Sequence, residues 1–468
     1  MSSAAYLSAT EMLAEFEAGR LSPVEATRAV LDRIEAANDA VNAYCLVDEE
    51  RALADATAAQ ERWRRGEPHG LLDGVPVSIK DILLTKGWPT LRGSRTTNPD
   101  QSWDVDAPAV ARLREHNAVL VGKTTTPELG WKGVTDSPLY GVTRNPWDTS
   151  KTAGGSSGGG SAAVALGMGP ISIGTDGGGS VRIPGSFSGV FAIKPTYGYV
   201  PHFPASPFGT LAHVGPMTWN VADSAIALDV LSGSDSRDWT AGPKRELSNV
   251  TTLDAGIDGM RIAFSPTLGF AKVDSEVARL VATAARVFTE LGATVREIDP
   301  PLGPDPVEEF HALWFSGVAA ATATLTDEQV ALLDPGLAAV RIEGAEYSAL
   351  DYINATARRA ELGRLMGAFH EQYDLLLTPT MPIPPFEAGQ EVPSGWSGER
   401  WTSWTQFTYP FNMTQQPAAT LPCGFTAAGL PVGLQVVGPR HADARVLTAC
   451  RAFEQARPWH GKRPALPC

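Results

Sequence analysis

A glycine-rich segment at residues 154–189 constrains this chain more than any other feature of its sequence. It opens with GGSSGGG and later carries GGGS, which ends at Ser180. A flexible linker would be rich in Gly and Ser alone, but here aliphatic residues are interleaved throughout (Val164, Leu166, Ile171, Ile173, Val181 and Ile183). Because glycine permits tight turns and close backbone approach, the segment is predicted to shape the backbone inside a hydrophobic core.

The same segment matches the residue patterns of two known motifs. Gly158, Gly160 and Ala163 fit G-x-G-x-x-A, and G-x-S-x-G occurs twice, at residues 154–158 and 155–159. Both motifs need a β-strand directly before them, whereas the preceding residues are polar and turn-like. A dinucleotide site and an α/β-hydrolase nucleophile turn are therefore disfavoured. A tight core loop without catalytic function is the structural alternative.

Hydrophobic patterns elsewhere predict an α/β protein. Residues 75–79 form an apolar run, typical of a buried strand, that ends at Lys80. Residues 260–264, 277–291 and 294–298 have the patterns of a strand, an amphipathic helix and a second strand. Alternation of this kind is typical of a sheet with helices packed against it.

Two helix-start signals indicate a helical arm at residues 1–68. Ser8 and Ser22 are each followed three residues later by a glutamate, which fits the capping box. Pro23 stands at the first helical position after the second box, where proline is favoured. We therefore expect helices to begin directly after both serines.

Charge and composition exclude several classes of function. The chain has 38 basic and 52 acidic residues, a net charge of −14, and no Lys/Arg-rich run, so we expect no nucleic-acid partner. Its four cysteines are scattered without zinc-ligand spacing, so we expect no metal. The absence of a signal peptide or a long apolar stretch predicts a cytoplasmic protein with no membrane partner.

Seven motifs, in order along the chain, resemble those of the amidase signature family. Residues 154–165 (GGSSGGGSAAVA) and 174–184 (GTDGGGSVRIP) look like the two halves of its signature, and residues 74–81 (GVPVSIKD) look like its lysine strand. The other four motifs are YGVTRNPWD, IKPTYGYVP, DLLLTPT and LPVGLQVVGPR. The resemblance implies one α/β/α domain, residues 1–468, around a mixed central sheet.

The family's Ser–cis-Ser–Lys triad maps onto Ser180, Ser156 and Lys80. In the family the nucleophile follows the first serine of the GGSS element by 24 residues, which is the separation of Ser156 and Ser180 here. The resemblance also implies a cis peptide between Gly155 and Ser156. In this arrangement Ser180 attacks an amide carbonyl and forms an acyl-enzyme.

The chemistry of these side chains agrees with that assignment. A serine needs a neighbouring base to remove its proton during attack, and a buried lysine can serve because burial disfavours its charged form. A hydroxyl both donates and accepts, so Ser156 can pass the proton between Ser180 and Lys80. Backbone N–H groups of Gly177, Gly178, Gly179 and Ser180 can stabilise an oxyanion. We expect Asp176 and Arg182 to pair and, with Ser157, to hold the catalytic residues in place. An ordinary ion pair without such a role is the alternative interpretation of Asp176 and Arg182.

The substrate pocket is predicted to be shaped by residues 301–407, a variable region of helices and loops. Residues 380–407 form a Pro/Trp-rich loop longer than a simple connection requires. Aromatic residues in and after this loop are expected to line the pocket: Trp396, Trp401, Trp404, Phe407 and Tyr409. In the family branch that releases ammonia from glutamine, an aspartate lies seven residues before the asparagine that matches Asn412, whereas this chain has Thr405.

We therefore predict an amidase that acts on small aryl or hydrophobic amides, with carbamates and esters as further substrates. We expect a small-molecule amide as its ligand and no cofactor, and a homo-oligomer is compatible with the sequence. Two alternatives stay open. One is a glutamine-hydrolysing amidotransferase subunit, which would need a partner protein, and the other is a non-catalytic scaffold that keeps the fold for binding.

Overall fold

One mixed β-sheet of eleven strands runs through the part of the chain that the structure describes. The structure is a computed structural model that describes residues 3–243 and 248–466. The strands lie in the order β1-β3-β2-β6-β8-β7-β12-β13-β11-β9-β10. Their bounds are β1 (Tyr44–Val47), β2 (Pro76–Lys80), β3 (Val119–Thr124), β6 (Ile171–Asp176), β7 (Phe191–Lys194), β8 (His213–Thr218), β9 (Arg261–Phe264), β10 (Thr294–Glu297), β11 (Leu375–Pro379), β12 (Ala418–Phe425) and β13 (Pro431–Val437). A separate pair consists of β4 (Asp136–Ser137) and β5 (Gly141–Val142).

Parallel pairing is confined to the two sides of the large sheet. Strands β3, β2 and β6 run parallel on one side, and β11, β9 and β10 do so on the other. The strands between them pair antiparallel, as does β1 with β3. Parallel strands are usually covered on both faces, and helices cover both faces here. The predicted α/β fold with a mixed central sheet is confirmed.

The helices divide between the two faces and the two ends of the molecule. Helices α4 (Pro108–Glu115), α7 (Val221–Leu231), α8 (Ser275–Glu290) and α14 (Asp443–Ala456) share the main core with strand residues that include Val77 and Ile79. Helices α5 (Gly158–Ala165) and α6 (Arg182–Ser188) contact the sheet through β2, β6, β12 and β13. Because successive strand residues face opposite sides, Lys80 lies on the face opposite Ile79.

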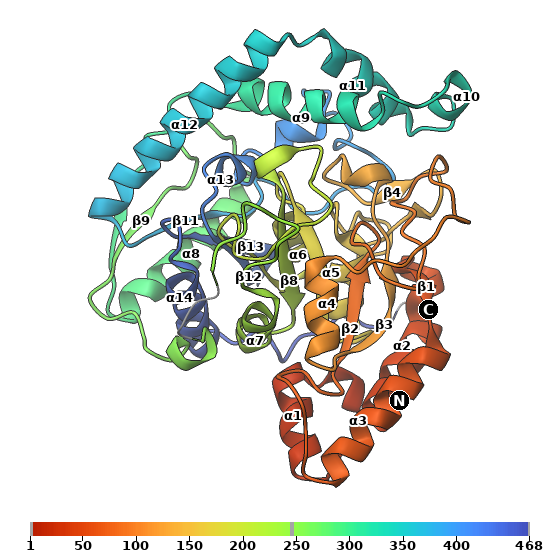
Figure 1. The fold of residues 1–468 in the computed structure, drawn as a ribbon. Helices are drawn as coiled ribbons and strands as arrows, with labels where there is room; N and C mark the ends of the chain where they lie inside the picture. Colours follow the sequence, from red (N-terminus) through yellow and green to blue (C-terminus); the bar gives the residue numbers. More distant parts are fainter. Residues whose placement is uncertain (1–2, 244–247, 467–468) are drawn as a thin grey trace.

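The remaining helices lie at the ends (Figure 1). One end carries α1 (Ala9–Glu17), α2 (Pro23–Val41) and α3 (Glu49–Arg64). The other end carries α9 (Val307–Ala321), α10 (Asp327–Val330), α11 (Pro335–Glu346) and α12 (Ala349–Gln372). The short helix α13 (Tyr409–Met413) precedes β12. None of the helices in residues 3–243 and 248–466 is both long and apolar enough to span a membrane.

Both predicted capping boxes are present in the N-terminal arm. The hydroxyl of Ser8 accepts the Glu11 N–H and that of Ser22 accepts the Glu25 N–H, each at 3.2 Å. The arm also contains β1, a strand that is not predicted from the sequence. This strand pairs with β3 and forms an edge of the sheet, so the arm contributes to the sheet as well as to the helical end.

Candidate active site

The glycine-rich segment folds inside the core, as predicted. It forms α5, β6 and α6, and every residue from 152 to 196 is buried. A Cβ on Gly160 would lie 2.3 Å from Ser172 Oγ, and one on Gly159 would lie 2.4 Å from the Ala43 carbonyl oxygen. Turns and isolated bridges, rather than a strand, precede Ser156. The structure therefore lacks the strand-to-helix turn that the α/β-hydrolase motif requires.

Lys80 is fully buried at the end of β2. Its Nζ donates to Ser156 Oγ at 2.7 Å and to Thr175 Oγ1 at 2.9 Å. Burial lowers the pKa of Lys80 well below its ordinary value, and the charge of Asp176 opposes this shift only in part. The amine can therefore be neutral and accept a proton. Thr175 is not predicted from the sequence, although a hydroxyl near the end of an apolar strand is a recognisable signal.

Ser156 and Ser180 line one cavity of about 310 Å³ together with Thr175 and Gly177. Ser180 is 6% exposed and Ser156 is 1% exposed. The Ser157 N–H donates to the Ser180 carbonyl at 3.0 Å, which ties the two serine-bearing segments together. The Ser157 hydroxyl donates to the Thr175 carbonyl at 3.2 Å. The Gly155–Ser156 peptide is cis, as the family resemblance implies.

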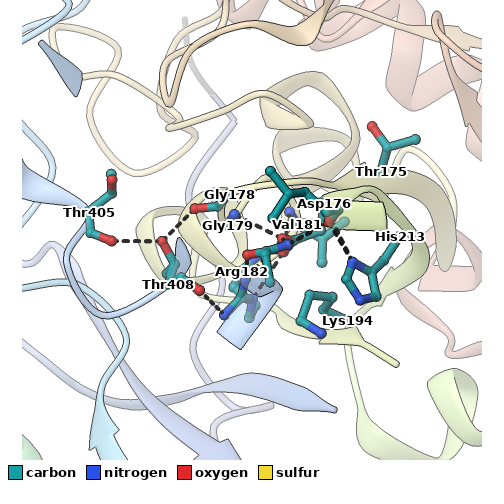
Figure 2. Close-up of polar contacts among 12 residues, drawn as sticks. Thr175, Asp176, Gly178, Gly179, Val181, Arg182, Lys194, His213, Thr405 and Thr408 are labelled. Atoms are coloured by element: carbon teal, nitrogen blue, oxygen red, sulfur yellow. Dashed lines mark hydrogen bonds and ion pairs between the residues drawn. The ribbon is translucent and has the colours of Figure 1, made fainter. Parts of the chain in front are cut away.

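The loop before Ser180 is held by the Asp176 carboxylate (Figure 2). One carboxylate oxygen accepts the Gly179 N–H at 2.8 Å and the other accepts the Val181 N–H at 3.2 Å. The Gly179 N–H, predicted as an oxyanion donor, is thus bonded to the Asp176 carboxylate in this structure. The N–H groups of Gly177 and Gly178 donate to no acceptor within residues 3–243 and 248–466.

Asp176 and Arg182 form a fully buried ion pair. Arg182 binds the carboxylate with two nitrogens, at 2.9 and 3.0 Å. Burial alone would raise the pKa of Asp176, but Arg182 holds it well below its usual range, with help from Lys194 and Asn412. The expected support of the nucleophile loop by this pair is present in the geometry.

Residues far along the chain complete this support, and their role is not predicted from the sequence. Asn412 donates to the Asp176 carboxylate at 2.8 Å. The Gln435 side chain and the Thr408 carbonyl accept from Arg182 at 2.9 and 3.0 Å. The Thr408 hydroxyl donates to the Gly178 carbonyl at 2.7 Å (Figure 2). The Gly178–Gly179 peptide is therefore held at both its carbonyl and its N–H group.

The aromatic residues predicted to line the pocket do not line the cavity. Trp401, Trp404, Phe407 and Tyr409 are at most 2% exposed and belong to a hydrophobic core. Trp401 packs behind the nucleophile loop, where a Cβ on Gly178 would come within 2.9 Å of its ring. Trp396 is partly buried and donates its Nε1 to Ser403 Oγ at 2.9 Å. Phe310 and Trp314 of α9 pack against Trp401 and Tyr409. Trp404 instead packs against Phe187 and Phe386.

Other aromatic residues line the cavity instead. They are Phe203, Phe208 and Trp314. The rings of Phe208 and Trp314 are stacked with centroids 3.7 Å apart. Trp314 and Ala321 belong to α9, so the predicted variable region does contribute to the cavity wall. Residues 202–208 also line the cavity, next to Trp314, and they are not selected from the sequence.

The chain is similar to known proteins over nearly its whole length. The Amidase family model matches residues 25–447. An acylamidase of Rhodococcus erythropolis is 40% identical, over 98% of this chain and 97% of its own length. A glutamyl-tRNA(Gln) amidotransferase subunit of Chloroflexus aggregans is 34% identical, over 98% of each chain. The crystal structure of a bacterial aryl acylamidase superposes with a TM-score of 0.92 at 31% identity, over 98% of each chain.

The fold, the buried lysine–serine site and these similarities together define an amide-hydrolysing enzyme. The chain belongs to the amidase family, that of the amidase signature enzymes.

Proposed function

We propose that the chain hydrolyses small aryl or hydrophobic amides through an acyl-enzyme on Ser180. The observation that carries this proposal is the 2.7 Å hydrogen bond between Lys80 and Ser156, in a cavity that Ser156 and Ser180 line together. A buried amine with a lowered pKa is available as a base. The same network argues against a non-catalytic scaffold, because binding alone does not require a buried lysine.

The proposed acylation step uses these side chains as a proton relay. Ser180 Oγ attacks the carbonyl carbon while its proton moves to Ser156 Oγ, and the Ser156 proton moves to Lys80 Nζ. The carbonyl π electrons move to oxygen, where the Gly177 and Gly178 N–H groups can donate to the oxyanion. As the C–N bond breaks, the departing amine takes a proton back through Ser156. Water then attacks the acyl-enzyme by the same relay and releases the acid.

The cavity wall supports an apolar substrate. Phe203, Phe208 and Trp314 line it, and its volume of about 310 Å³ suits a small ligand. Burying an aryl group against these rings is favourable. The Rhodococcus acylamidase and the bacterial aryl acylamidase are consistent with such a substrate.

The amidotransferase alternative rests on the similarity to the Chloroflexus protein. Free glutamine carries an ammonium group, and burying such a charge is costly unless it is paired. No aspartate or glutamate is present among the described residues that line the cavity, and Thr405 is fully buried outside it. We therefore place glutamine hydrolysis second.

A partition experiment tests the acyl-enzyme. Hydrolysis of 4-nitroacetanilide and 4-chloroacetanilide in the presence of hydroxylamine forms the same acetyl-enzyme on Ser180. The ratio of acetohydroxamate to acetate should therefore be identical for the two anilides. Different ratios would show that the leaving amine is still present when the second nucleophile attacks, which contradicts the proposal.

A further inference from the structure

Arg92 is the one permanently charged side chain among the described residues that line the cavity. The other lining residues are apolar or uncharged apart from His202. Burial lowers the pKa of His202, which favours its neutral form. The substrate cavity therefore presents a single fixed positive charge within an otherwise largely apolar wall.

The backbone holds Arg92 against this cavity. Arg92 and Leu129 both have positive φ, 57° and 53°, and both line the cavity. The Leu129 N–H donates to the Arg92 carbonyl at 2.8 Å, so a backbone hydrogen bond joins these two positions. A positive φ is unfavourable for a side chain other than Gly, Asn or Asp. This conformation persists because the surrounding contacts enforce it, and it fixes where the guanidinium group can reach.

No carboxylate of the described residues is left to neutralise Arg92. Burial lowers the pKa of Arg92, and the Asp81 charge raises it by a smaller amount. One Asp81 oxygen already pairs with Lys123 at 3.1 Å, and the other accepts from Tyr140 at 2.8 Å. Within residues 3–243 and 248–466, Arg92 has neither an ion pair nor a side-chain hydrogen bond. Arg92 lines the cavity, so its guanidinium group is available to an acceptor on a bound ligand.

We propose that Arg92 binds a carboxylate group of the substrate, at a position away from the scissile amide bond. This inference rests on the proposed function of the same cavity and narrows its substrate class to amides that carry both an apolar portion and an anionic group. A guanidinium group can bind a carboxylate through two parallel hydrogen bonds. In a partly desolvated site such bonds are stronger than in water.

Two pairs of matched substrates test the proposal and locate the carboxylate. On the amine side, 4-acetamidobenzoate is compared with 4-acetamidoacetophenone. On the acyl side, succinanilate is compared with 4-oxo-N-phenylpentanamide. Each pair replaces a carboxylate by a methyl ketone of similar size. We expect one acid to exceed its ketone in kcat/KM by about ten- to a hundredfold, the range for hydrogen bonds to a charged group.

Variants separate the charge of Arg92 from its bulk. Arg92→Gln should abolish the acid-to-ketone preference, and Arg92→Lys should retain part of it. Arg95→Gln, an exposed arginine in the same segment, should leave the preference unchanged. If both ketones are the better substrates of the natural enzyme, or if Arg92→Gln keeps the preference, the proposal is overturned.

A binding measurement covers failure of the proposed function itself. If none of the four amides is hydrolysed, ligand binding is measured instead of turnover. The measured quantity is the rate at which phenylmethanesulfonyl fluoride labels Ser180, with benzoate or with acetophenone present. Stronger protection by benzoate that Arg92→Gln removes would support the anion site on its own. Equal protection by the two compounds, or protection that Arg92→Gln leaves intact, would overturn it.

Discussion

Lys80 Nζ lies 2.7 Å from Ser156 Oγ, and both side chains are at most 1% exposed. An ammonium group in this position would have lost its hydration without gaining a direct ion pair, which explains the lowered pKa. The hydrogen bond therefore joins a hydroxyl to an amine that is predisposed to be neutral. Most of the proposed chemistry depends on this one contact.

Replacing Lys80 by Met should remove the base while filling the same space. We expect kcat/KM for 4-nitroacetanilide to fall by about a hundred- to ten-thousandfold, the usual contribution of general acid–base catalysis. Lys86→Met, at an exposed position in the same segment, should retain full activity. An active Lys80→Met enzyme would require a different base.

The pH dependence follows from the lowered pKa of Lys80. Only the neutral amine can accept the proton, so kcat/KM should rise with pH through the folded-state pKa of Lys80 and then level. Because burial lowers that pKa, the midpoint should lie well below the ordinary value of 10.5. The profile is measured with a neutral anilide. A rate that is independent of pH over the whole range in which the protein stays folded would contradict this assignment.

Asp176→Asn should destabilise the protein strongly. It leaves the Arg182 charge buried without its carboxylate, which typically costs about 3–5 kcal/mol. The pKa of Asp176 is lowered on folding, so its contribution to stability is present above the unfolded pKa and is lost as pH falls toward the folded one. Urea denaturation of both proteins at neutral and acidic pH measures this. Equal unfolding free energies at neutral pH would argue that the pair is dispensable.

Replacing Phe208 by Ala should mainly affect substrate selectivity, whereas replacing Trp401 by Ala should mainly affect stability. Phe208→Ala removes a ring that lines the cavity, so it should reduce turnover of 4-nitroacetanilide more than that of acetamide. Trp401→Ala removes a core ring, so it should lower the unfolding free energy by about 3–5 kcal/mol. Its effect on the two substrates should be similar. Selective loss of anilide turnover in Trp401→Ala would restore the original pocket prediction.

The sequence predicts the local features of this protein better than its distant contacts. The strand that ends at Lys80, both capping boxes and the buried glycine loop were accessible from residue patterns. Strand β1 has only four residues, too few for a clear alternation, and its partner β3 lies far along the chain. Its existence is decided by tertiary pairing rather than by its own sequence.

The errors within the site have physical causes of the same kind. A Trp-rich loop has the same composition whether it borders a cavity or packs into a core, and here most of its aromatic residues belong to a core. The GGGS motif indicates that no side chain blocks access to the backbone before Ser180. It does not indicate the direction in which each N–H group points. The sequence therefore predicts Gly179 as an oxyanion donor without showing that Asp176 accepts its N–H.

Covalent labelling tests the central claim most directly. The enzyme is treated with phenylmethanesulfonyl fluoride, digested, and analysed by mass spectrometry to find the modified residue. The account predicts one label, on Ser180, that appears as anilide hydrolysis disappears, and no label on the Ser180→Ala protein. A label on Ser156 or Ser157, or full activity of Ser180→Ala, would contradict the account.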